Sequence, residues 1–285
     1  MNIFIAIWGS YYHLMTEAAL GLYELLERES LLESRDCKIY FQGGISSVVQ
    51  YFSVRPVIQI PFFKPRLESI KLSNAEIMNL QLKMLSTPEC FKRMLNLSNY
   101  LIKRTPHCET EKGITVINRL TKRCYRETAI LLEKLKIFGV PVRVVSFENM
   151  SLAEQISAAR NTLLLIAPHG AGTVNMMFMP KGGGVIELFP KGYENWHAGA
   201  MANAFGHKLV EIESQQPGEI GRLPSDDIRK HIEKYGWPTR LTVRQLRKRK
   251  LPGFNRFVRD VKSYSIDPDL IVEVSRDLLR GIHCE

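Results

Sequence analysis

The stretch Leu163-Leu-Leu-Ile-Ala-Pro-His-Gly-Ala-Gly-Thr-Val-Asn175 decides the fold. Its first residues, Leu163 to Ile166, form a continuous apolar run, which is typical of a strand buried on both faces of a parallel sheet. Pro168 cannot donate to a sheet ladder, so we expect the strand to end near it. Small residues and then Thr173 to Phe178 follow, which predicts a tight turn and the start of a helix. The stretch therefore predicts one strand–turn–helix unit of an open α/β sheet.

The turn after this strand has the chemistry of an anion site. Ligands of open α/β sheets bind at the carboxyl ends of the strands. Gly170, Ala171 and Gly172 have almost no side chain, so their backbone N–H groups would be exposed at a helix N-terminus, which favours a pyrophosphate. His169 could add a donor to that anion, and Asn175 lies in the helix that follows. The alternative interpretation is a tight turn with a capping histidine.

The composition is that of a globular protein, because 45% of its 285 residues are hydrophobic and 24% are charged. The formal net charge of +10 predicts anionic partners: nucleotides, acidic glycans, nucleic acid or a membrane surface. The five cysteines are scattered, which favours free thiols, and no Cys/His spacing indicates a metal site. The sequence contains no apolar run of membrane-spanning length and no recognisable export signal.

The N-terminal part, residues 1–112, has the pattern of a small α/β unit. We expect a helix at about Leu14–Arg28 and a mainly helical segment at Asn74–Lys92. His13 and Glu17 are four residues apart, so they would share one helix face. Either could act as the general base on an acceptor hydroxyl. Their spacing also resembles a metal-ligand pair, but the sequence supplies no third ligand.

Residues 113–262 alternate strands with helices, which predicts a parallel, doubly wound sheet. The expected elements are, in order, Ile114–Ile117, Arg123–Phe138, Val142–Phe147, Ser151–Ala159, Leu163–Ile166, Gly184–Phe189, Trp196–Gly206 and Lys208–Ile212. Ser151 and Glu154 have the spacing of a capping box. Residues 263–285 form the third part, an amphipathic helix at Ile266–Arg280 with Asp267 as its N-cap.

Charged side chains follow or end the expected strands, at the same edge as the turn. Arg119 and Arg123 could clamp a diphosphate and neutralise a departing nucleotide, the alternative being a solvated basic turn. Glu148 could accept from a base or ribose, while Gln155 more simply positions that loop or caps a helix. Glu187 lies between apolar residues, where a charge is costly unless it is paired. A ribose hydroxyl, an arginine or a purely structural ion pair would satisfy it.

Several motifs, in this order, resemble glycosyltransferase family 61. They are Ile114-Thr-Val-Ile-Asn-Arg-Leu-Thr-Lys-Arg123, Ser151-Leu-Ala-Glu-Gln155, Pro168-His-Gly-Ala-Gly-Thr-Val-Asn175, Phe178-Met-Pro180 and Val185-Ile-Glu-Leu188. Tyr12-His-Leu-Met-Thr-Glu17 is similar to the N-terminal histidine motif of that family, although Leu14 stands where an aromatic residue is usual. The resemblance covers roughly residues 5–30 and 113–212.

The resemblance implies a GT-B-like α/β fold, in which two Rossmann-like domains face each other across a cleft. It also implies inverting transfer of a sugar, such as GlcNAc or xylose, from a UDP-sugar to a hydroxyl of a glycoprotein or glycan. Arg119, Arg123, His169 and Gly170 would hold the donor diphosphate, with Asn175 and Glu187 as further contacts and His13 and Glu17 on the acceptor side. No cofactor is firmly implied and no metal is required, because arginines and a helix N-terminus can stabilise a leaving diphosphate.

Two other functions stay open. The departure at Leu14 and the short N-terminal part are compatible with a non-catalytic nucleotide- or glycan-binding relative. The basic segment Arg240–Lys262 could bind nucleic acid, but a charge run is usually a solvated face, so we expect no nucleic-acid partner. The expected location is cytoplasmic for a complete chain, and the Golgi or ER lumen for an N-terminally truncated eukaryotic form.

Overall fold

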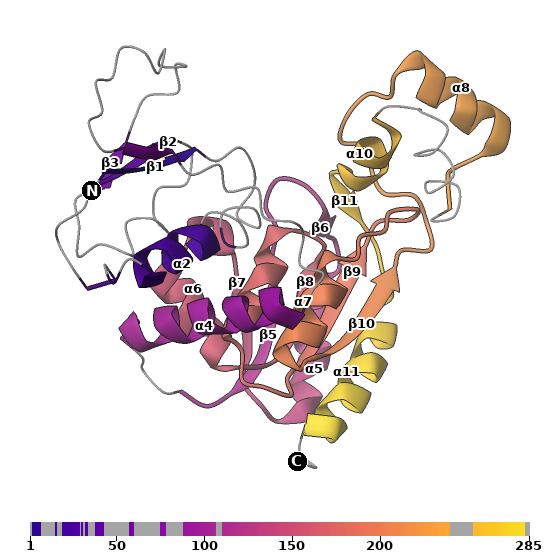
Figure 1. The fold of residues 1–285 in the computed structure, drawn as a ribbon. Coiled ribbons are helices and arrows are strands. Elements are labelled where there is room, and N and C mark those ends of the chain that lie inside the picture. The colour runs from indigo at the N-terminus through magenta and orange to yellow at the C-terminus, as the bar shows by residue number, and fades with distance from the viewer. Residues whose placement is uncertain are drawn as a thin grey trace. The chain divides into compact units, whose positions relative to one another are not determined.

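Two parallel sheets organise the chain in the computed structural model (Figure 1). The structure describes residues 2–6, 15, 19–28, 30, 32–33, 38–42, 57–59, 75–77, 88–106, 110–239 and 253–282. The chain divides into two compact units, Met1–Pro106 with Ser151–Glu154, and His107–Met150 with Gln155–Glu285. Each unit contains one of these sheets, and the second unit also contains a two-stranded parallel pair. The predicted α/β class is therefore confirmed.

The first unit contains a four-stranded sheet in the order β3-β2-β1-β4. Its strands are β1 (Asn2–Ala6), β2 (Lys38–Gln42), β3 (Val57–Gln59) and β4 (Ala75–Ile77), and its helices are α2 (Leu20–Arg28) and α4 (Pro88–Arg104). The two helices contact each other through the tilted rings of Tyr23 and Tyr100, 5.2 Å apart, and an ion pair between Arg93 and Glu24.

One prediction for the first unit is wrong. The segment Asn74–Lys92 was predicted as mainly helical, but its residues Ala75–Ile77 pair with β1 as a parallel strand. The helix α4 begins only at Pro88, a residue that suits the first turn of a helix because it has no N–H to satisfy. His13 and Glu17, the predicted acceptor-side pair, lie outside the described residues.

The second unit is built on a five-stranded parallel sheet in the order β10-β9-β8-β5-β7. The strands are β5 (Gly113–Ile117), β7 (Val142–Val145), β8 (Thr162–Pro168), β9 (Gly184–Phe189) and β10 (Lys208–Glu213). β8 continues to Pro168, which stands opposite Leu188. Strands β5 and β9 are buried along their whole length, and β8 is buried at all positions but one, so the prediction of a doubly covered sheet is confirmed.

Helices and short strands connect and cover this sheet. They are β6 (Cys124–Tyr125), α5 (Thr128–Leu135), η3 (Lys136–Phe138), η4 (Phe147–Asn149), α6 (Leu152–Arg160), η5 (Ala171–Phe178), α7 (His197–Phe205), α8 (Asp226–Tyr235), α10 (Phe254–Arg259), β11 (Ser263–Tyr264) and α11 (Pro268–Ile282). The helix predicted at Arg123–Phe138 begins late, at Thr128, because Cys124–Tyr125 instead pairs with β11. Both predicted caps are confirmed: Glu154 accepts from the N–H of Ser151, and Asp267 accepts from the N–H of Asp269.

Side chains alternate between the two faces of the five-stranded sheet. Even-numbered residues such as Val116, Ile166 and Leu188 form one apolar core with α5 and α11. α11 lies beside β8, β9 and β10 along this face (Figure 1). Because the side-chain period of a strand is two, the odd-numbered Glu187 projects to the opposite face.

The strand order reverses between β5 and β8. The chain leaves β5 toward β7 on one side and then returns to β8 on the other side of β5. In open α/β sheets such a switch point opens a crevice at the carboxyl ends of the two strands, and ligands bind there. The loop with Arg119 follows β5 and the turn with Gly170 follows β8, so both lie at this switch point.

Candidate functional site

Gly170 brings the turn after β8 against the loop after β5. A Cβ added at Gly170 would overlap Nη1 of Arg119 and lie 3.7 Å from Nη2 of Arg123. A Cβ added at Gly172 would lie 3.2 Å from Cδ1 of Ile117, at the end of β5. Ala171 begins the helix η5 directly after Gly170. The absence of a side chain at Gly170 therefore lets two guanidinium groups reach the start of η5, and the absence of one at Gly172 lets the turn pack against the end of β5.

Arg119 is held at two points on its side chain. Its Nε donates to the carbonyl of Lys122 at 2.9 Å, and its Nη2 lies 3.4 Å from Oε1 of Glu148. Glu148 belongs to η4, which directly follows β7, so this ion pair joins the carboxyl ends of β5 and β7. Glu148, predicted to accept from a base or ribose, pairs with an arginine here.

Arg123 is a buried cation. The side chain is 7% exposed, and within the described residues its Nε has no hydrogen-bond partner. The backbone adopts φ +57°, and its N–H donates to the carbonyl of Val261 at 2.8 Å. Burial, and then the charges of Arg119 and Arg259, lower the pKa of Arg123 to about 10. A group held in this way gains free energy when an anion supplies the missing hydrogen bonds.

Arg259 is a third arginine at this position, and sequence reasoning missed it. It lies in α10 and makes a two-pronged ion pair with Asp260, with Nε 2.7 Å from Oδ1. The hydrogen bond to Asp260 raises its pKa, and Tyr193 adds to that effect. It comes close to Arg123 because β11, which follows α10, pairs with β6, which follows Arg123. No local sequence pattern predicts the pairing of β6 with β11, because the two strands are far apart in the chain.

His169 is fixed by a carboxylate and two aromatic rings. Its Nδ1 donates to Oε1 of Glu187 at 2.8 Å, between adjacent strands of the sheet. The imidazole stacks on Phe189, with ring centroids 4.9 Å apart, and contacts Tyr193 at 4.8 Å. Burial, and then the charges of Arg123, Arg119 and Arg259, hold the pKa of His169 well below its usual range. The ring is therefore neutral at pH 7.

Asn175 supports the site from inside the protein. It is fully buried in η5, and its Nδ2 donates to Oε1 of Gln155 at 3.0 Å. Gln155 in turn donates to the carbonyls of Phe147 and Met150, the loop that carries Glu148. These two hydrogen bonds are consistent with the predicted role of Gln155 in positioning the loop. Asn175 in turn orients Gln155, so it supports the same loop indirectly.

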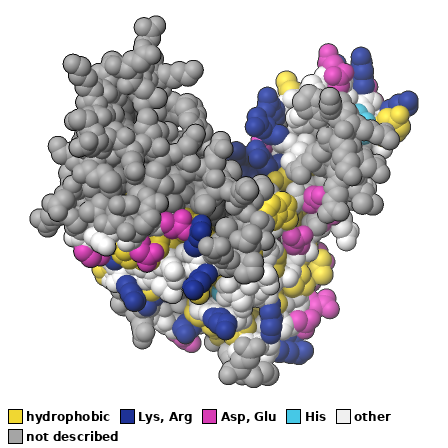
Figure 2. Space-filling view, viewed as in Figure 1, with side chains coloured by type: hydrophobic (Ala, Val, Ile, Leu, Met, Phe, Trp, Pro, Cys, Tyr) yellow, Lys and Arg dark blue, Asp and Glu magenta, His cyan; other side chains and the backbone are white. Residues whose placement is uncertain are grey.

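These residues form one basic cluster at the carboxyl ends of β5, β7 and β8. We call it the arginine cluster, and it comprises Arg119, Arg123 and Arg259 with their neighbours Lys122, His169 and Gly170. Within the described residues, Arg119 pairs with Glu148 and Arg259 pairs with Asp260, and His169 contacts a third carboxylate, Glu187. Lys and Arg side chains also gather over α10 and β11 in Figure 2. Chemically, the cluster can bind a doubly charged anion and stabilise negative charge that develops on it.

No three His, Cys, Asp or Glu side chains of the described ranges come together as a metal site. No helix among those ranges is long and apolar enough to cross a membrane.

Comparison with known proteins gives a family match and several partial relatives. The family model described as Glycosyltransferase 61 matches residues 11–186, more than half of the chain. Protein O-linked-mannose beta-1,4-N-acetylglucosaminyltransferase 2 of Mus musculus is 35% identical over 81 residues, which are 28% of this chain and 14% of that protein. The protein of the same name from Homo sapiens is 33% identical over 81 residues, with the same shares. The chain thus matches a small part of these relatives' length.

Two solved structures are similar at low sequence identity. The structure of E. coli heptosyltransferase WaaC with ADP is matched with a TM-score of 0.43 and 10% identity, over 82% of this chain and 97% of that one. A glycosyl transferase family 9 protein from Veillonella parvula DSM 2008 is matched with a TM-score of 0.38 and 9% identity, over 98% and 97% of the two chains. Both TM-scores are below 0.5, so the assignment of the chain to a protein family rests on the family match alone.

Proposed function

Since the chain belongs to glycosyltransferase family 61, we propose that it is an inverting glycosyltransferase. It transfers a sugar, such as GlcNAc or a pentose like xylose, from a UDP-sugar to a hydroxyl of a glycoprotein or glycan. The relatives named for N-acetylglucosamine transfer to O-linked mannose support a sugar-transfer reaction of this kind. The acceptor hydroxyl attacks the anomeric carbon, and UDP leaves from the opposite side.

The observation that carries the proposal is the buried Arg123 beside Arg119, at the switch point of the sheet. Negative charge develops on the diphosphate as the bond to the anomeric carbon breaks. Preorganised donors in a dry site stabilise such charge more strongly than water does. Arg119 and Arg123 supply those donors, and the backbone N–H groups at the start of η5 add to them.

His169 and Glu187 hold the turn that faces the diphosphate. The hydrogen bond between them joins the ends of β8 and β9 and fixes the orientation of the imidazole. A bound diphosphate places negative charge near the ring, so it raises the pKa of His169 and favours protonation. In the proposed complex His169 then becomes a donor to the anion. His13 or Glu17 in the first unit would take the proton of the acceptor hydroxyl.

The test is thermal stabilisation of the full chain by a panel of nucleotides. A ligand that binds only the folded state stabilises it by mass action and so raises the melting temperature. At a ligand concentration of one hundred times the dissociation constant, the free energy of unfolding rises by about 2.7 kcal/mol. We expect UDP and UDP-sugars to stabilise the wild type, and Arg119→Ala and His169→Ala to reduce that effect.

Turnover separates the enzyme from the non-catalytic relative. Release of UDP from UDP-GlcNAc or UDP-xylose, in the presence of O-mannosylated or xylan-type acceptors, is the expected result. Stabilisation by UDP without any sugar transfer would instead favour the non-catalytic nucleotide-binding relative. A folded chain that no nucleotide stabilises would contradict the donor site itself.

A further inference from the structure

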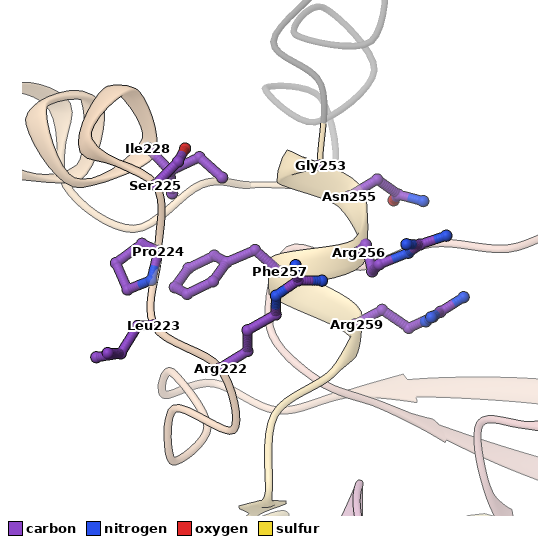
Figure 3. A pocket seen from close by; sticks show the side chains of 10 residues that line it. All are labelled: Arg222, Leu223, Pro224, Ser225, Ile228, Gly253, Asn255, Arg256, Phe257 and Arg259. Atoms are coloured by element: carbon purple, nitrogen blue, oxygen red, sulfur yellow. The ribbon is translucent and has the colours of Figure 1, made fainter.

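A cavity of about 770 Å³ lies beside the arginine cluster, within the second unit. The segment from Arg222 to Ile228 forms one wall and α10 forms the other (Figure 3). Its volume is in the range of natural pockets for ligands the size of a few sugar rings. Arg259 belongs to both the cavity and the arginine cluster, so the two adjoin.

The charge of the cavity is strongly positive. Among the described residues, its lining includes Arg222, Arg256 and Arg259 and no Asp or Glu. Within the part of the chain that the structure describes, only Arg259 of these three has an ion-pair partner, Asp260. Figure 3 shows Arg256 and Arg259 extending from the same side of α10. Guanidinium groups without carboxylate partners are suited to bind a carboxylate or phosphate bidentately.

The remaining lining is suited to a sugar ring rather than to a bare anion. Phe257 points toward Pro224 across the cavity in Figure 3, and both give an apolar wall. The buried Oδ1 of Asn255 has no hydrogen-bond partner among the described residues. An amide oxygen accepts only, so its natural partner is a hydroxyl group of the ligand. The cavity therefore combines anion donors, an apolar face and one hydroxyl acceptor.

The nucleoside of the donor does not fit this lining. A ribose is commonly recognised by a carboxylate that accepts from its hydroxyls, and the described residues that line the cavity supply none. A uracil ring carries no charge for three arginines to balance. The donor diphosphate already has Arg119 and Arg123. The cavity is thus an additional anion site beside the place where the sugar is transferred.

We propose that the cavity binds an acidic saccharide, one that carries a carboxylate or a phosphate, as part of the acceptor. This inference rests on the proposed function, because the acceptor must lie beside the donor diphosphate. Arg222 and Arg256 hold the acidic group, and Asn255 accepts from a ring hydroxyl.

Isothermal titration of the full chain tests this assignment. The probes are glucuronic acid, glucose 6-phosphate, glucose and inorganic phosphate, each with and without UDP. The acidic sugars should bind at least about tenfold more tightly than glucose, since one charge-assisted hydrogen bond raises the affinity by about tenfold. Arg222→Gln and Arg256→Gln should each weaken this binding about tenfold and change the UDP affinity less than about twofold. Comparing the two acidic sugars decides between carboxylate and phosphate.

Arg280→Gln is the matched control, because Arg280 is exposed on α11 and outside the cavity. It should leave acidic-sugar binding unchanged. An equal loss in this variant, equal affinity for glucose, or equal affinity for inorganic phosphate and glucose 6-phosphate would each overturn the proposal. Tight binding of a single-stranded oligonucleotide that the cavity variants abolish, with no acidic-sugar binding, would assign the cavity to nucleic acid instead.

The same titrations separate this inference from the proposed function. If UDP binds and the acidic sugars do not, the cavity assignment is wrong and the donor site stands. If the acidic sugars bind through Arg222 and Arg256 while UDP does not bind at all, the cavity site stands and the glycosyltransferase proposal fails.

Discussion

The two ends of the five-stranded sheet use the same residue types in opposite ways. At the amino ends of the strands, Arg143 donates to the carbonyls of Asn161 and Glu111 and to Oγ1 of Thr110. At the carboxyl ends, Arg123 is buried with an Nε that has no partner among the described residues. Arg143 therefore satisfies backbone and side-chain acceptors of the fold. Arg123 keeps an Nε–H that could still donate to a ligand.

A glycine and a histidine at each end also differ in what they contact. Gly113, at the amino end of β5, lies against the backbone of Pro141, whereas Gly170 lies against the guanidinium of Arg119. His207, just before β10, has Nε2 2.8 Å from the carbonyl of Met176, while His169 lies among three arginines. The amino end of the sheet is therefore built for stability and the carboxyl end for a ligand. Matched substitutions at the two ends test this distinction.

The largest difference is expected between Arg123→Gln and Arg143→Gln. Loss of the Arg123 guanidinium should weaken UDP binding about 100-fold, because two charge-assisted hydrogen bonds contribute about that much. The free energy of unfolding should stay the same or rise, since a buried, incompletely bonded cation is removed. Titration calorimetry and chemical denaturation measure the two quantities.

Arg143→Gln should give the reverse pattern. Its three acceptors lose their donors, so the free energy of unfolding should fall by about 1–3 kcal/mol, with UDP affinity unchanged. If the two variants lost UDP affinity equally, the distinction between the two ends of the sheet would be wrong.

A smaller difference is expected between Gly170→Ala and Gly113→Ala. The new methyl at Gly170 meets the guanidinium groups of Arg119 and Arg123, and the residue has φ +159°, which an L side chain rarely adopts, so some stability should be lost as well. The displaced guanidinium should lose its place at the diphosphate, and UDP affinity should fall about tenfold. At Gly113 the methyl meets the backbone of Pro141, so overpacking should cost about 1–3 kcal/mol of stability with no effect on UDP. Melting curves with and without UDP measure both variants, and an equal response to UDP in the two variants would contradict this.

The smallest effect is a pH dependence of stability that involves His169 and His207. The pKa of each is lowered in the folded state, chiefly by burial, so below pH 6.5 the unfolded chain binds more protons. Stability contributed by each histidine is therefore present above pH 6.5 and falls as the pH is lowered. One such group contributes a loss of roughly 1 kcal/mol between pH 6.5 and 5.5.

A bound UDP-sugar should affect only one of the two histidines. Its diphosphate raises the pKa of His169, so denaturation curves at saturating UDP-sugar should lose most of that group's pH dependence. The His207→Gln variant should show the same response to UDP-sugar, and His169→Gln should show none. A ligand effect that survives in His169→Gln would remove His169 from the donor site.

Local patterns were enough to predict the centre of the fold. The apolar run before Pro168 and the small residues after it give β8 and its turn, and the following Thr173–Phe178 lies in η5. Arg119 and Arg123 could be placed at the same edge because both follow a strand of a parallel sheet. The partnership of Gln155 with its loop could also be predicted from its position at the start of a helix.

Long-range pairing explains what the sequence could not reveal. Arg259 reaches the cluster through the two-residue pairing of β11 with β6, which also displaces the start of α5 to Thr128. The partner of Glu187 depends on the register of β8 against β9, and that register sets His169 beside it. The strand Ala75–Ile77 is recognisable only once β1 is there to pair with it. Each of these features depends on segments that are distant in the chain.

A crystal structure of the full chain with UDP tests the central claim most directly. We expect diphosphate oxygens within about 3.2 Å of the guanidinium nitrogens of Arg123 and Arg119, at the turn that begins with Gly170. A diphosphate bound anywhere else, including the cavity lined by Arg222 and Arg256, with Arg123 still buried and without an anion, would contradict it.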